Sequence, residues 1–275
     1  MSAPSSSRLA TPIPDVQSLS DDRRLAIDKV GVKGISYPIT LRTRGGGSQT
    51  TVASIDMYVS LPHYRKGTHM SRFLEVLNEY ARPLTPDCIM VVARTIKDRL
   101  EAETAHLELR FPYFIEKAAP VTGATGLMDY KVTFSATCNS FEDFVMGVRA
   151  PATSLCPCSK EISAYGAHNQ RCEIEARLRL ASSGSGVTMW IEDVVEHLER
   201  AASSPVYAVL KRPDEKFVTE AAFDNPKFVE DIVRDLALAL ENDPRVRWYS
   251  ASSENFESIH NHNAYAEITR EKHSP

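Results

Sequence analysis

The chain has 275 residues, of which 43% are hydrophobic and 25% are charged, a composition typical of water-soluble globular proteins. Its formal net charge of -4 gives no chain-wide attraction to nucleic acid or to an anionic membrane surface. The sequence has neither an apolar stretch long enough to cross a membrane nor the apolar core of a signal peptide near its start. We therefore expect a cytoplasmic protein without nucleic-acid or membrane partners, in which local groups of basic side chains bind any anionic ligand.

Residues 1 to about 22 are rich in Ser, Pro and Asp and have no hydrophobic period, which predicts a flexible tail. Apolar residues then alternate with a period of two in four segments, and this pattern predicts strands with one buried face. The segments are 53–61, 107–115, 130–138 and 172–180. Weaker strand patterns lie near 35–43, 141–149, 245–252 and 263–270.

Apolar stripes with a helical period lie between these strands. They cover residues 73–77, 92–100, 191–198 and 228–240. Ser71 is a possible N-cap of the first helix, while Asn225 as N-cap and Pro226 at the first helical position would begin the last one.

The predicted order is strand, strand, helix, helix, strand, strand, and it occurs twice. This order favours an α+β protein built from two ββααββ units, each with an antiparallel sheet of four strands and helices on one face. We assign 1–33 to a tail and lead-in, 34–140 to the first unit and 141–275 to the second, which carries most candidate site residues. Because the predicted sheets have exposed edges, we expect a homo-oligomer.

The segment 154–171, SLCPCSKEISAYGAHNQR, contains the highest density of chemically useful side chains. The five cysteines of the chain are an odd number, and a chain of this size needs no disulfides, so we expect free thiols. The single residue between Cys156 and Cys158 does not fit a structural zinc site. Cys156 and His168 are candidate ligands of an open metal site, but a lone cysteine is more often a small buried side chain, and a lone histidine is more often a surface or hydrogen-bonded residue.

Further ligands would have to come from distant segments. Glu215, in the predicted turn KRPDEK, and His260 or His262, in SIHNHN, are candidates, since a thiolate, imidazole and carboxylate set with an open position is typical of catalytic divalent metals. A solvated turn carboxylate and a surface histidine remain the alternatives.

Two helix starts carry candidate substrate-binding residues. Glu230 either interacts with the positive end of its helix dipole or accepts hydrogen bonds from a guanine-like ring. The segment 66–72, KGTHMSR, is either an ordinary capped helix start or a phosphate site formed by Lys66, His69 and Arg72. The basic residues that could extend such a site are Lys160, Arg171, Lys211 and Arg212.

Four segments, LCPCSKEIS, GAHNQR, KGTHMSRF and YAVLKRPDEKFVTEAAFDNPKFVED, together closely resemble the type IB GTP cyclohydrolases of the tunnelling-fold superfamily. The resemblance runs from about residue 34 to the end of the chain. It implies a homotetramer of tandem tunnelling-fold subunits with active sites at the subunit interfaces. It also implies conversion of GTP and water to 7,8-dihydroneopterin triphosphate and formate, the first step of folate and pterin biosynthesis.

The resemblance also assigns roles to individual residues. It implies that Cys156, His168, Glu215 and His260 bind a divalent metal, Zn, Mn or Fe, and that Glu230 anchors the purine. Cys156, Cys158 and His168 are then the expected catalytic residues, because ring opening and closure need proton transfer by a thiol or an imidazole. The triphosphate would be held by basic side chains, which are Lys66, His69, Arg72, Lys160, Arg171 and Lys211.

Two other functions are compatible with these residues. A nitrile reductase of the same fold would use Cys156 as a nucleophile and take hydride from a nicotinamide cofactor. A non-enzymatic purine-binding protein would need Glu230 but no metal site. Chelation separates the two enzymes, because it should abolish cyclohydrolase activity and leave a nucleophilic cysteine competent.

Overall fold

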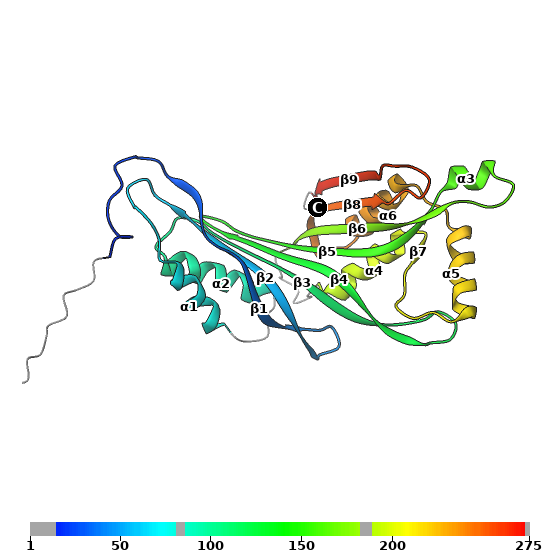
Figure 1. Cartoon of the computed structure of the whole chain (residues 1–275), viewed down its shortest axis with the longest axis horizontal. Helices are drawn as coiled ribbons and strands as arrows, with labels where there is room; N and C mark the ends of the chain where they lie inside the picture. The colour runs from blue at the N-terminus through cyan, green and yellow to red at the C-terminus, as the bar shows by residue number, and fades with distance from the viewer. Residues whose placement is uncertain (1–14, 81–85, 182–188, 273–275) are drawn as a thin grey trace, which may run out of the picture.

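The computed structural model describes residues 15–80, 86–181 and 189–272, and its strands form one antiparallel sheet (Figure 1). The strands of this described part are β1 (Ile27–Arg42), β2 (Ser48–Leu61), β3 (Ala105–Ala118), β4 (Thr125–Cys138), β5 (Glu142–Leu155), β6 (Asn169–Leu180), β7 (Ser204–Pro205), β8 (Val246–Asn255) and β9 (Ala264–Glu271). Their spatial order is β1-β2-β3-β4-β5-β6-β8-β9, and the short β7 pairs with β5.

The helices of the described residues lie between the strands of each half. They are α1 (Met70–Glu79), α2 (Pro86–Arg99), α3 (Pro157–Ile162), α4 (Ile191–Ala201), α5 (Arg212–Asp224) and α6 (Val229–Glu241). The predicted α+β class and the repeated ββααββ order are confirmed, with α3, β7 and α5 as additions to the second half. None of these helices, within the described ranges, is long and apolar enough to cross a membrane.

The two predicted four-stranded sheets are joined into one, because β4 pairs with β5 from Lys131↔Arg149 to Cys138↔Glu142. Buried apolar residues of both halves form a single cluster, and the unit boundary at residue 140 remains a prediction.

One face of the sheet is apolar from β2 to β8. Directly opposed residues on successive strands share a face, and one such row is buried on six strands: Ile55, Leu109, Phe134, Met146, Leu178 and Tyr249. The other face carries paired charges, for example Arg149 with Glu173 at 3.2 Å and with Glu175 at 2.7 Å. The helices of the described residues therefore pack on the apolar face, and the opposite face is polar.

Two predicted helix starts are wrong. Helix α1 begins at Met70 with His69 as its N-cap, so Ser71 lies inside the helix. Asn225 ends α5 instead of beginning α6, because its Nδ2 donates to the carbonyls of Ala202 and Ser203, each at 3.1 Å. Helix α6 starts after Phe228, whose backbone N–H is capped by an acidic side chain at the third helical position.

The part of the predicted tail that is described is bound to the rest of the chain. Lys66 N donates to Leu19 O at 2.9 Å, and Gly67 N donates to Gln17 O at 3.1 Å. Ser20 also forms a bridge with Arg65. Residues 17–21 thus differ from the flexible tail that was predicted, whereas residues 1–14 lie outside the described residues.

A partly buried ion pair links β3 to α4 and gives a stability prediction. Lys117 Nζ lies 2.7 Å from Glu199 Oε1, and the Tyr130 hydroxyl donates to the same oxygen at 2.7 Å. Burial lowers the pKa of Lys117 although Glu199 opposes this shift. We expect Glu199→Ala to reduce the free energy of unfolding by about 3 kcal/mol, because it leaves an ammonium that is only 14% exposed without its counter-charge. Urea denaturation followed by circular dichroism measures this loss.

The control is the double variant Lys117→Met/Glu199→Leu, which removes both charges and should recover most of the stability. If Glu199→Ala cost less than about 1 kcal/mol, the pair would behave like an exposed one and the prediction would be wrong.

Candidate metal and substrate site

Cys156 and His168 are hydrogen-bonded at the base of the loop that connects β5 to β6 in their hairpin. Strands β5 and β6 pair as far as Leu155↔Asn169, so the residues between them form a loop that carries α3 at one end of the molecule (Figure 1). Cys156 N donates to His168 O at 3.1 Å. Cys156 is also the N-cap of α3, and its Sγ accepts a hydrogen bond from Ser159 N at 3.4 Å.

Several polar side chains that sequence patterns did not reveal surround this pair. Ser159 Oγ donates to Cys156 O at 3.1 Å and accepts from His168 N at 3.2 Å. His168 Nδ1 lies 2.9 Å from Gln170 Oε1 and 3.3 Å from Ser258 Oγ. Gln170 follows His168 by two residues, and such spacing at a strand puts both side chains on one side, which is the signal that could have identified it.

His260 and His262 lie beyond β8 in the loop that contacts His168 through Ser258. Their rings stack on each other with centroids 5.1 Å apart and an interplanar angle of 19°. Both side chains are exposed, so this arrangement does not select one of them as a ligand. The assignment of His260 stays a prediction.

Glu215 lies in the first turn of α5 and not in the irregular turn that was predicted. The helix begins there because Asp214 caps it, accepting a hydrogen bond from Lys211 N at 2.8 Å, and because Pro213 suits the first turn. The Glu215 side chain is exposed. Lys211, the N-cap of α5, lies beside it.

Within the described parts of one chain, no group of three or more His, Cys, Asp or Glu side chains is close enough to hold a metal ion. The chemistry of the pair at the hairpin base nevertheless fits a divalent metal, since thiolate and imidazole are both good ligands for Zn or Fe. One chain therefore brings together Cys156 and His168 and leaves Glu215 and His260 apart from them.

Glu230, Lys160 and Arg171 belong to segments that are tied to this hairpin. Lys227 N, just before α6, donates to Leu155 O at 3.0 Å and so places the start of α6 beside the end of β5. Glu230 is exposed in the first turn of α6, where its side chain makes no recorded hydrogen bond or ion pair with another described residue. Lys160 Nζ donates to Phe223 O at the end of α5. Arg171 is an exposed residue of β6, and Cys158 is exposed in α3.

The basic segment 66–72 lies at the opposite end of the molecule from α3 (Figure 1). His69 Nε2 is 3.2 Å from Asp15 Oδ2, and Arg72 donates to Arg99 O at 3.4 Å. Lys66 is exposed. A single chain therefore does not bring Lys66, His69 and Arg72 to the Cys156 and His168 pair.

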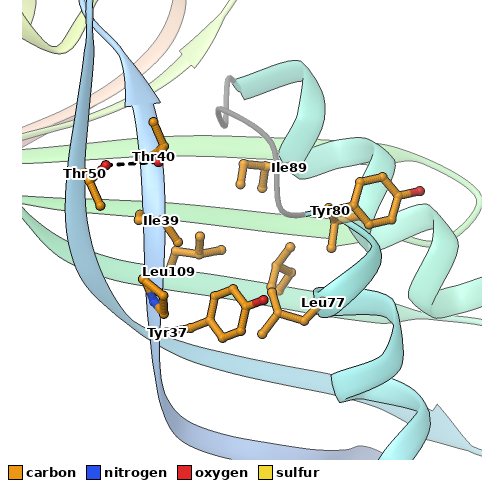
Figure 2. Close-up of a pocket in the computed structure, with 11 residues that line it drawn as sticks. Tyr37, Ile39, Thr40, Thr50, Leu77, Tyr80, Ile89 and Leu109 are labelled. Carbon is orange, nitrogen blue, oxygen red and sulfur yellow. Dashed lines mark hydrogen bonds between the residues drawn. The ribbon is translucent and has the colours of Figure 1, made fainter.

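A cavity of about 270 Å³ lies between β1 and the helices α1 and α2 (Figure 2). Its walls are mainly apolar, with Ile39, Leu77 and Leu109 among them, and its polar groups are hydroxyls such as those of Thr40 and Thr50, which lie 3.1 Å apart. Among the described residues that line it, none is acidic, basic or a histidine.

Asp214 fixes the start of α5 and with it the position of Glu215. Its carboxylate accepts hydrogen bonds from Thr122 Oγ1 at 2.6 Å and from the backbone N–H of Val121 at 2.9 Å. Burial opposes ionisation of Asp214, but the hydrogen bonds from Thr122, Lys211 and Val121 outweigh it and hold the pKa of Asp214 well below its ordinary value.

We expect Asp214→Asn to lower the melting temperature at pH 7. A folded-state pKa below the unfolded value of about 3.9 contributes stability above that pH, and the contribution is lost as pH falls toward the folded-state pKa. The difference in melting temperature between wild type and Asp214→Asn should therefore become smaller below about pH 4. Asp224→Asn, at the exposed end of the same helix, is the control. A difference that stayed constant down to pH 2 would contradict this origin of the stability.

The fold matches solved structures of very different sequence. Uricase from Arthrobacter globiformis aligns with a TM-score of 0.53 at 9% identity, covering 90% of this chain and 94% of that chain. Urate oxidase from Bacillus sp. TB-90 aligns with a TM-score of 0.53 at 9% identity, covering 90% and 100% of the two chains. At such low identity these matches establish the fold alone. The chain is thus an α+β protein with the tunnelling fold of the urate oxidases.

Sequence comparison defines the family. The model of the type I GTP cyclohydrolase folE2 family matches residues 13–266. GTP cyclohydrolase FolE2 of Magnetococcus marinus is 57% identical over 259 residues, which cover 94% of this chain and 96% of that protein. GTP cyclohydrolase FolE2 of Geobacter sulfurreducens is 54% identical over 260 residues, covering 94% and 99%. This chain belongs to the type I GTP cyclohydrolase FolE2 family.

Proposed function

We propose that the protein is a metal-dependent GTP cyclohydrolase of type IB, which converts GTP and water to 7,8-dihydroneopterin triphosphate and formate at the start of folate and pterin biosynthesis. Membership of the FolE2 family over nearly the whole chain supports the reaction. The observation that carries the site is the pairing of Cys156 with His168 at the base of the β5–β6 hairpin. The backbone hydrogen bond brings a cysteine and a histidine to the same place in the fold, and thiolate and imidazole are suitable donors for a catalytic metal.

In this proposal the metal ligands are Cys156, His168, Glu215 and His260. When bound, a divalent ion such as Zn, Mn or Fe would supply the Lewis acidity that makes water a nucleophile near neutral pH. Because Glu215 and His260 stand apart from the other two in one chain, we infer that the set is completed on assembly, in a cytoplasmic homotetramer with sites between subunits. The exposed edge strands β1 and β9 would permit such association.

The substrate would be positioned by residues of this chain and of a neighbouring subunit. The Glu230 carboxylate would accept hydrogen bonds from N1–H and the 2-amino group of guanine, which orients the imidazole ring of GTP toward the Cys156 and His168 pair. Lys160 and Arg171 lie on the same hairpin as this pair. Lys66, His69, Arg72 and Lys211 would reach the triphosphate from a neighbouring subunit.

Ring opening and reclosure need proton transfer in addition to hydrolysis. The Cys158 thiol is exposed in the first turn of α3, close in sequence to Cys156. It and an imidazole are the groups that we propose for this transfer.

The direct test gives purified protein GTP with Zn, Mn or Fe and measures formate and, after oxidation, a fluorescent pterin. Both products should appear, and chelation should abolish them. When a deazaguanine nitrile and a reduced nicotinamide cofactor replace GTP, oxidation of the cofactor that resists chelation would instead identify a nitrile reductase. GTP binding without formate would identify a purine-binding protein.

We expect Glu230→Gln to raise KM for GTP by roughly tenfold to a hundredfold, because hydrogen bonds to a charged acceptor contribute about 1.5–3 kcal/mol. Steady-state kinetics with the metal-loaded enzyme measures this change. Glu220→Gln, which removes an exposed carboxylate in an i,i+4 pair with Lys216 on α5, should leave KM unchanged. If Glu230→Gln had the kinetics of wild type, Glu230 would be only a helix-dipole partner.

A further inference from the structure

A buried relay of side chains lies behind His168. His168 Nδ1 is 2.9 Å from Gln170 Oε1, and Gln170 Nε2 donates to Ser154 Oγ at 2.7 Å. Gln170 is 8% exposed and Ser154 is fully buried. The two residues face each other across the paired strands β5 and β6, so the sheet itself holds their side chains together on one face.

The chemistry of a primary amide gives this relay a direction. The amide has a donor end and an acceptor end. With its NH₂ group on Ser154, Gln170 presents only its carbonyl oxygen to His168, and a carbonyl oxygen can accept a hydrogen but cannot donate one. In this orientation of the amide, Nδ1 carries the ring hydrogen and Nε2 carries the lone pair. Ser258 Oγ, 3.3 Å from Nδ1, is compatible with this tautomer because a hydroxyl can also accept a hydrogen bond.

We propose that Gln170, held by Ser154, is a positioning residue that keeps His168 in the Nδ1–H tautomer and presents Nε2 as a ligand. This inference rests on the proposed function, because it takes His168 to be a metal ligand. Substitution of a residue that orients a metal-binding histidine in this way typically lowers metal affinity by about 10- to 100-fold. The Gln170 amide is uncharged. It therefore fixes the tautomer without adding a negative charge to that of the Cys156 thiolate in the proposed site.

Three variants separate this role from a merely structural one. Gln170→Leu removes the carbonyl acceptor and leaves the Ser258 hydroxyl, 3.3 Å from Nδ1, which can donate as well as accept. Gln170→Glu keeps an acceptor at the same place. Ser154→Ala releases the amide so that it can turn and present its NH₂ group. Circular dichroism of each metal-free variant checks that the sheet is formed.

The first measurement is nitrogen-15 NMR of metal-free protein labelled in histidine, at a pH where the ring is neutral, with His168 assigned from the spectrum of His168→Ala. Wild type and Gln170→Glu should show a protonated Nδ1. Gln170→Leu and Ser154→Ala should shift His168 toward the Nε2–H tautomer. The second measurement is Co(II) affinity in competition with a chromophoric chelator, which should fall about 10- to 100-fold in Gln170→Leu and stay near the wild-type value in Gln170→Glu.

A protonated Nε2 in wild type, or Gln170→Leu that binds Co(II) as tightly as wild type, would overturn the inference. The proposed function can fail separately. Wild type with the expected tautomer and the expected Co(II) affinities, but without formate from GTP, would overturn the activity and leave the positioning role of Gln170 standing.

Discussion

Replacement of Cys156 by Ala is expected to lower formate release from GTP by about a thousandfold or more. Lewis-acid stabilisation by a metal contributes several kcal/mol to a hydrolytic transition state, and every 1.36 kcal/mol corresponds to a factor of ten in rate. Cys156 and His168 are the two proposed ligands that one chain brings together. Loss of the thiolate leaves His168 without its nearest proposed partner, and metal bound per subunit should fall together with the rate.

The matched control is Cys138→Ala. Cys138 is a buried residue of β4, and burial raises the pKa of its thiol, which keeps it protonated and unsuited to bind a metal. Formate is measured enzymatically and metal content by mass spectrometry after gel filtration. If Cys156→Ala kept wild-type metal content and activity, Cys156 would be only the partly buried N-cap of α3, without a role in the reaction.

Two inactive variants should restore activity to each other when their subunits are mixed. The basic segment with Arg72 and the hairpin with Cys156 lie at opposite ends of one chain (Figure 1). If both serve one site, they must come from different subunits of a symmetric assembly. We expect Arg72→Glu to lower activity roughly a hundredfold, because a lost hydrogen bond to a charged group costs up to about 3 kcal/mol.

When Arg72→Glu and Cys156→Ala subunits are refolded together in equal amounts, random assembly makes about one site in four from two intact parts. Activity should therefore return to roughly a quarter of the wild-type value. A mixture of Cys156→Ala with His168→Ala should stay inactive, because both residues belong to the same hairpin. Mixed oligomers that form, as native mass spectrometry would show, and yet remain inactive would contradict a site shared between subunits.

The strands and the amphipathic helices were predicted well because their signal is local. In β3, for example, buried Leu107 and Leu109 alternate with partly exposed neighbours, so each side chain's burial follows from its position along the strand. Helices α4 and α6 likewise bury continuous stripes that include Leu198 and Leu236. Such periods require no knowledge of the partner element.

Helix α5 was missed for the opposite reason. It buries only Asp214 and Ala222, which form no apolar stripe, and its capping carboxylate binds Thr122 on a distant hairpin. The residue that ends it, Asn225, was interpreted as the cap of the next helix, since its true partners, Ala202 and Ser203, are not neighbours in sequence. Glu215 was consequently placed in a turn instead of a helix.

The sequence by itself determined the fold class, the family resemblance and the types of residue available for the reaction, because periodicity and long matching segments are properties of the chain alone. Only the tertiary structure decided which of those residues meet. Pairing of β5 with β6 closes a loop that brings Cys156 to His168 and sets Gln170 behind it. The joined sheet places α1, which carries Arg72, at the end of the molecule opposite to α3. The order of the strands in the sheet, and not distance along the chain, decides which helices and loops lie close together.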